Sequence, residues 1–84
     1  MTDQTLHISS LLLRAEPARM EQVFTAIKAV PGSDVALSDE SGKIIVTLET
    51  PSERQIVDAL NTLQLIDGVV SAALVFHQAD TVTG

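Results

Sequence analysis

Three segments of the chain carry apolar side chains at both alternating sets of positions. Residues 8–13, 44–48 and 69–76 are rich in Ile, Leu and Val, and neither alternate set in them is clearly polar. Successive side chains of a strand point to opposite faces of a sheet, so a half-solvated strand alternates apolar with polar residues. The pattern therefore predicts strands whose two faces both carry apolar residues.

Two further segments have the period of a helix. The first follows Pro17, which suits a first helical turn, and ends at Pro31 and Gly32, which stop a helix. Its apolar residues recur at steps of three and four and are Met20, Val23, Phe24, Ile27 and Val30.

The second helix is expected to begin at a capping box. Thr50 is the predicted N-cap, Pro51 takes the first helical position and Glu53 completes the box. Its predicted apolar stripe consists of Ile56, Val57, Leu60 and Leu63.

The order of the elements predicts a fold. Strands are expected at residues 6–14, 34–38, 43–49 and 69–77, with a turn at 39–42 and a polar, frayed tail from 78 to 84. With right-handed crossovers, this βαββαβ order gives a single α+β domain of the ferredoxin-like type. Its four-stranded antiparallel sheet carries both helices on one face. The other face stays open, and an open apolar surface usually has a partner.

The alternation of side chains indicates which residues occupy the open face. Ile44, Val46 and Leu48 are more apolar than their neighbours and are expected to face the helices. A shift of one residue would exchange the two sets. The residues predicted on the open face, and proposed to form the binding surface, are Ile8, Ser10, Leu12, Ile45, Thr47, Glu49, Ser71, Ala73, Val75 and His77.

Composition narrows the class of partner. The 84 residues have a net charge of −6, with only five Lys and Arg and 2% aromatic residues. Nucleic-acid binding needs a basic footprint and stacking aromatics, so this class is excluded, whereas basic partners are favoured. Absence of Cys excludes disulfides and thiolate chemistry. The N-terminus does not resemble a signal peptide, and no apolar segment approaches the length of roughly 20 residues that spans a membrane. The chain is therefore expected to be cytoplasmic.

The residue types that carry catalysis do not form a recognisable constellation. Ser9 and Ser10 have no nearby base and no glycine-flanked elbow. His7 and His77 lie at neighbouring strand ends but are expected on opposite faces, and two ligands do not close a zinc site. We therefore expect neither an enzyme nor a bound metal or cofactor.

Several short segments together resemble a known family. They are His-Ile-Ser-Ser-Leu at 7–11, Val-Pro-Gly at 30–32, Ser-Gly-Lys-Ile-Ile-Val at 41–46 and Leu-Val-Phe-His-Gln at 74–78. In this order they resemble the NapD family, the small cytoplasmic assembly chaperones of periplasmic nitrate reductase, over about residues 6–78.

The resemblance implies a function. Such proteins bind the twin-arginine signal peptide of the catalytic subunit precursor and delay export until its molybdenum cofactor and iron–sulfur cluster are in place. The apolar stretch of that peptide would lie on the open face, against Ile8, Leu12, Ile45, Ala73 and Val75. Its arginines would meet Glu49 or the carboxylates of the 39–42 turn. The free protein is expected to be a monomer.

Three other interpretations are compatible with the βαββαβ order of elements. A regulatory domain of the ACT type usually has an Asp-Arg-Pro-Gly-like turn after the first strand, where this chain has Arg14-Ala15-Glu16-Pro17. An acylphosphatase-like enzyme needs an anion-cradling loop there, which Glu16 and Pro17 disfavour. A homodimer packed sheet to sheet would also cover the open face, and sedimentation with and without a signal peptide distinguishes it from a chaperone.

Overall fold

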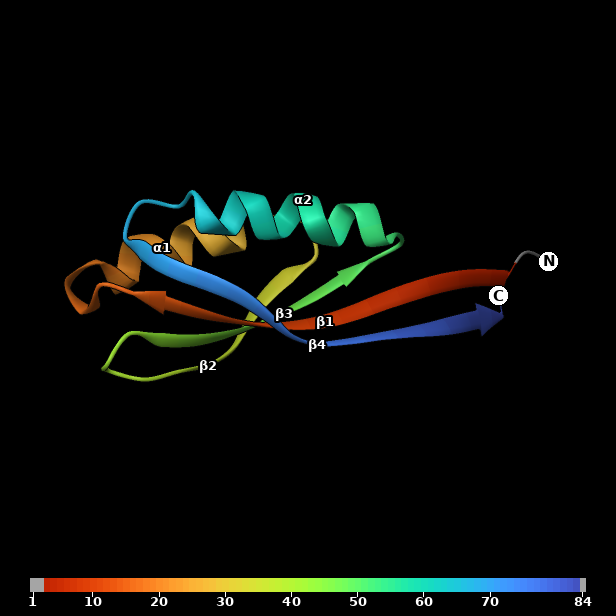
Figure 1. The fold of residues 1–84 in the computed structure, drawn as a ribbon, viewed down its shortest axis with the longest axis horizontal. Helices are drawn as coiled ribbons and strands as arrows, with labels where there is room; N and C mark the ends of the chain where they lie inside the picture. Colours follow the sequence, from red (N-terminus) through yellow and green to blue (C-terminus); the bar gives the residue numbers. More distant parts are fainter. Residues whose placement is uncertain (1–2, 84) are drawn as a thin grey trace.

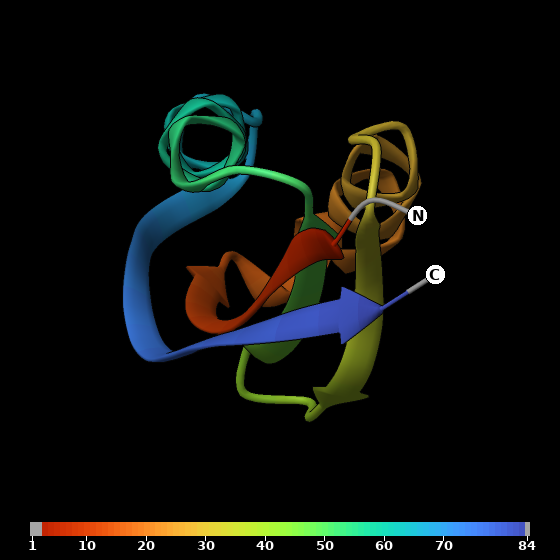
Figure 2. The same ribbon diagram turned by 90° about the vertical axis from the view of Figure 1, so that its right-hand side faces the viewer.

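The elements form one antiparallel sheet covered on a single face by both helices. The computed structural model describes residues 3–83, and the side chains of residues 6–78. The strands are β1 (Asp3–Ala15), β2 (Ser33–Ser38), β3 (Lys43–Thr50) and β4 (Val69–Thr83), in the sheet order β2-β3-β1-β4. A short 3-10 turn at Pro17–Arg19 leads into α1 (Met20–Lys28), and α2 (Glu53–Gln64) precedes β4. Figures 1 and 2 show the two helices side by side above the sheet, which confirms the predicted ferredoxin-like fold.

The core lies between the sheet and the helices. In β1 and β3 the alternation follows the prediction, since Leu11 and Leu13, and Ile44, Val46 and Leu48, have no exposed surface. These side chains meet the stripes of the two helices. The other core residues are Ala15, Val23, Ile27, Val30, Ile56, Ala59 and Leu63.

Two details of α2 differ from the prediction. Its N-cap is Ser52, whose Oγ accepts a hydrogen bond from the Gln55 amide, so the capping box at Thr50 was wrong. Thr50 instead ends β3 in a buried position, and its hydroxyl donates to the Ser52 carbonyl oxygen. Val57 is 55% exposed, and Ala59 is buried in its place. Val57 adjoins Ile56 and lies beyond the edge of the stripe formed by residues 56, 59, 60 and 63.

Strands β1 and β4 are longer than their hydrophobicity predicted. Their pairing runs from Ala15 and Val69 to Asp3 and Thr83, so the segment after residue 77 continues the strand and is not a frayed tail. In Figure 1 the two strands extend as a ribbon beyond the helices towards the termini. Backbone pairing needs no apolar side chains, so the polar composition of this segment gave no sign of it.

Candidate functional site

The open face, which is the face of the sheet opposite the helices, has an apolar row at its centre. Cross-strand pairing places Leu37, Ile45, Leu12 and Ala73 directly beside one another, one residue from each strand. Leu37 is 70% exposed, although it is a large apolar residue. These four residues, the apolar row, cross the whole sheet, and no element of the described chain covers them.

Charged residues lie on either side of the apolar row. Asp34 and Glu49 form an acidic end, because Asp34 pairs with Thr47 and Glu49 lies two residues further along β3. At the opposite end, Arg14 and Lys43 are direct cross-strand neighbours. All four are exposed. Along β3 the two ends are six residues apart, which corresponds to roughly 20 Å of strand.

Most residues predicted for the open face do occupy it. The pairings join Ile8 to Glu49, Ser10 to Thr47, Leu12 to Ile45 and to Ala73, and Arg14 to Ser71. Residues directly opposite each other in a sheet share a face, so these positions form one surface.

The end of β4 differs from the prediction. The register shifts between Ser10 and Leu11 of β1, where Leu74 pairs with Leu11 and Phe76 pairs with Ser10, leaving Val75 as the extra residue of a β-bulge. A bulge adds one residue to one strand, so the residues after it point to the opposite faces from those that simple alternation predicts. Phe76, which is 51% exposed, therefore lies on the open face beside Ser10.

The same bulge moves His77 away from the open face. His77 pairs with Ser9, which is fully buried on the helix side of β1. The His77 Nε2 lies 3.1 Å from the Nδ1 of His7, and the two rings are nearly parallel, at 11°. The expectation that His77 faces outward and that the two histidines lie on opposite faces was wrong.

Strand β2 contributes to the open face a residue that the alternation along the sequence did not predict. Its register shifts between Val35 and Leu37, so Val35 pairs with Val46 on the helix side and Leu37 pairs with Ile45 on the open face. Without the shift at Ala36, Val35 and Leu37 would share a face. The sequence offers no signal for this bulge, because a bulge of this kind does not require a particular residue type at position 36.

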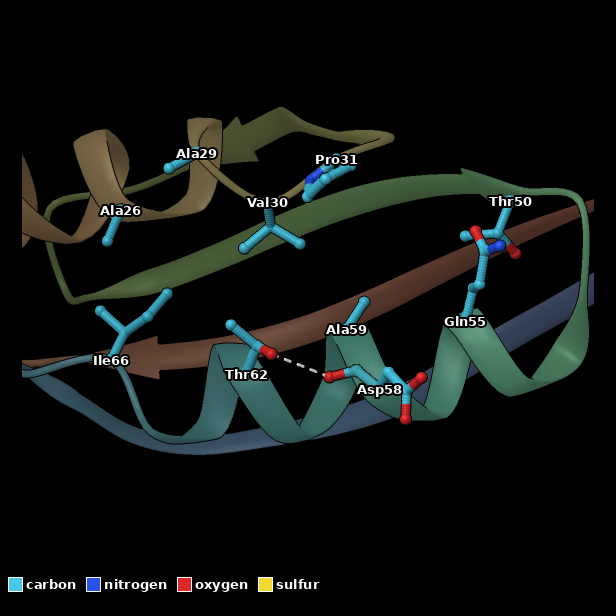
Figure 3. Close-up of a pocket in the computed structure, with 10 residues that line it drawn as sticks. All are labelled: Ala26, Ala29, Val30, Pro31, Thr50, Gln55, Asp58, Ala59, Thr62 and Ile66. Atoms are coloured by element: carbon cyan, nitrogen blue, oxygen red, sulfur yellow. Dashed lines mark hydrogen bonds between the residues drawn. The ribbon is translucent and has the colours of Figure 1, made fainter.

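A separate hollow lies in the helical layer. It has a volume of about 530 Å³ and lies between the C-terminal end of α1 and the side of α2, as Figure 3 shows. Ala26, Ala29 and Ala59 line it with small apolar side chains, and Asp58 is its one ionisable lining residue. It shares no residue with the open face. No helix in the described chain is both long and apolar enough to cross a membrane.

The sequence and the fold both match one family. The model of the family described as NapD protein matches residues 6–81. Chaperone NapD of Escherichia coli (strain K12) is 31% identical over 74 residues, which cover 87% of this chain and 85% of that protein. Chaperone NapD of Haemophilus influenzae is 25% identical over 75 residues, covering 88% and 81%.

A solved structure agrees with these relatives. The solution structure of the E. coli Tat proofreading chaperone protein NapD superimposes with a TM-score of 0.80 at 31% identity, covering 87% of this chain and 78% of that chain.

Proposed function

Because this chain belongs to the NapD family, we propose that it is a Tat proofreading chaperone that binds the twin-arginine signal peptide of the catalytic subunit precursor of periplasmic nitrate reductase. Binding would delay export until the cofactors of that subunit are in place. The chain itself would act in the cytoplasm, as a monomer when free, without catalysing a reaction.

The observation that carries the proposal is the apolar row. Four apolar residues, Leu37, Ile45, Leu12 and Ala73, lie side by side on a face without cover in the described chain. Burying such surface is favourable by about 25 cal/mol per Å², so an apolar peptide segment is the occupant that gains most there. Phe76 widens this surface next to Ser10.

The charges on the open face favour one orientation of the peptide. A twin-arginine signal peptide has its paired arginines before its apolar stretch. The arginines would lie at the acidic end, near Asp34 and Glu49, and the apolar stretch would cross the apolar row towards Arg14 and Lys43. The turn acids Asp39 and Glu40 are less suited, because Lys43 and Arg14 lie at the same end of the sheet. The peptide would therefore run in the direction of β1.

The sheet edges favour a helical peptide lying on the face. Strand addition needs a regular edge, and β-bulges interrupt an edge. Here the two edge strands are β2 and β4. Strand β2 contains one register shift, at Ala36, and β4 contains two, at Val70 and at Val75. An amphipathic helix needs no edge and would bury its apolar side against the apolar row.

The direct test is calorimetric titration of the protein with a synthetic twin-arginine signal peptide. Ile45→Asp introduces a charge into the apolar row and is expected to abolish measurable binding. Val57→Asp is the matched control, since it makes the same kind of change on an exposed position of α2, in the other layer. Circular dichroism should show both variants folded.

Two results would contradict the proposal. One is unchanged peptide affinity in a folded Ile45→Asp variant, which would place the peptide elsewhere. The other is a dimer in sedimentation that neither dissociates nor gains mass with the peptide, which would assign the open face to a second copy of this chain.

A further inference from the structure

Three potential metal ligands converge on the helix side of the sheet. They are His7 in β1, His77 in β4 and Glu53, the first residue of α2. One ligand atom from each lies within 4.8 Å of the others, and the two ring nitrogens are 3.1 Å apart. The cluster is independent of the signal-peptide proposal, because it faces away from the open face.

We propose that His7, His77 and Glu53 bind a zinc ion. Two imidazole nitrogens and one carboxylate oxygen are a ligand set that zinc takes in open sites, with water at the fourth position. Zn–N bonds of 2.0–2.1 Å in a tetrahedron place two nitrogens about 3.3 Å apart, close to the observed separation of His7 Nδ1 and His77 Nε2. Magnesium and calcium prefer all-oxygen sites, so these ions are disfavoured.

The burial of the three groups fits an open zinc site. His7 is 9% exposed, so its ring is held in place, whereas His77 and Glu53 are exposed. The Glu53 side chain can therefore approach a bound ion with a change of rotamer, and water can occupy the fourth position. The ion would join the β1–β4 ribbon to the start of α2.

A buried hydroxyl next to the cluster supports the proposal. Ser9 is fully buried and directly opposite His77, and its Oγ has no hydrogen-bond partner among the described residues. A histidine that binds metal through one ring nitrogen usually donates a hydrogen bond from the other. Ser9 is the polar neighbour across the strand pair that could accept it.

The test uses the untagged full chain, first treated with a chelator, because a polyhistidine tag would itself bind zinc. Titration with zinc chloride should show one ion per chain and an increase in the melting temperature, since a ligand specific to the folded state stabilises it. Magnesium chloride at the same concentration should have no effect. In ¹⁵N NMR spectra, zinc should shift a ring nitrogen of both His7 and His77.

Substitutions distinguish zinc binding at this cluster from zinc binding elsewhere on the protein. His77→Gln changes an exposed residue, so the fold should remain, and the zinc affinity should fall by at least about 10-fold. Glu53→Gln should also weaken zinc binding, because a neutral amide oxygen is a poorer zinc ligand than a carboxylate oxygen. Glu40→Gln, an exposed carboxylate in the β2–β3 turn, is the control and should bind zinc as the original chain does.

Either of two results would overturn the proposal. Binding only at millimolar zinc would mean an adventitious ion only. An affinity unchanged by His77→Gln would mean that the two histidines form only the hydrogen bond between their rings.

Discussion

A single carboxylate organises the turn between β2 and β3. One Asp39 oxygen, Oδ1, accepts hydrogen bonds from the Ser41 hydroxyl at 2.6 Å, the Ser41 amide at 3.0 Å and the Lys43 amide at 3.2 Å. The hydrogen bond from the Ser41 side chain is the largest cause that holds the pKa of Asp39 below its usual value of 3.8. The turn ends at Gly42, whose φ of +100° suits glycine.

The pKa of Asp39 predicts how the turn responds to acid. Its carboxyl resonance, followed by NMR, should titrate with a midpoint below 3.8. Because the folded pKa is lowered, the stabilising contribution is present above the unfolded pKa and is lost as the pH falls through the folded pKa. Asp39→Asn should therefore lower stability at neutral pH, with the difference from the original chain shrinking in acid. Glu40→Gln is the control, and a midpoint at or above 3.8 would refute the assignment.

If the open face binds a signal peptide as proposed, Glu49 is a candidate partner for one of its arginines. It is exposed and pairs with Ile8 within the sheet. Glu49→Gln should weaken peptide binding by about 1–3 kcal/mol, the cost of losing a hydrogen bond to a charged group. Replacing the paired arginines of the peptide by lysine should also weaken it, because lysine lacks the bidentate fork.

Combining Glu49→Gln with the lysine-substituted peptide tests whether Glu49 directly contacts a peptide arginine. If Glu49 meets an arginine, the losses should be less than additive in a calorimetric double-mutant cycle. Glu40→Gln in the same cycle should be additive. Strict additivity for Glu49 would mean that another carboxylate binds the arginine, and Asp34 would be examined next.

At the scale of elements, the regular strands were predictable and the bulged ones were not. Alternation placed Ile45 outward and Val46 inward because β1 and β3 pair without interruption over residues 7–14 and 43–50. It failed after Val75 because a β-bulge exchanges faces without requiring a particular residue type. The N-cap of α2 was mispredicted for a similar reason. Thr50 and Ser52 are both favourable N-cap residues, and only the path of the chain selects Ser52.

Adjacent residues of β3 provide a sharp test of the assigned faces. Val46 is fully buried in the core, so Val46→Asp would bury an unpaired charge and should unfold the domain. Ile45→Asp, the neighbouring change on the open face, should leave it folded. Urea unfolding followed by circular dichroism measures both. A folded Val46→Asp variant beside an unfolded Ile45→Asp variant would show the faces to be exchanged.

At the scale of the whole molecule, topology was easier to predict than length and charge distribution. The order of two strand–helix–strand units, each with a glycine after its helix, is visible in sequence and determines the sheet order. The ribbon of β1 and β4 makes the molecule 48 Å long, and hydrophobicity gave no sign of it. The net charge of −6 is likewise a property of composition, whereas the separation of Asp34 and Glu49 from Arg14 and Lys43 required the register.

The overall charge predicts how salt affects signal-peptide binding. Attraction between an acidic protein and a basic peptide is screened as ionic strength rises, whereas burial against the apolar row is not weakened by salt. Affinity measured by calorimetry should therefore fall from low to high sodium chloride, but only in part. Glu49→Gln should bind more weakly at low salt and show a shallower decrease, because one of the screened interactions is already absent. Affinity independent of salt would remove charge from recognition and leave the apolar row as its sole basis.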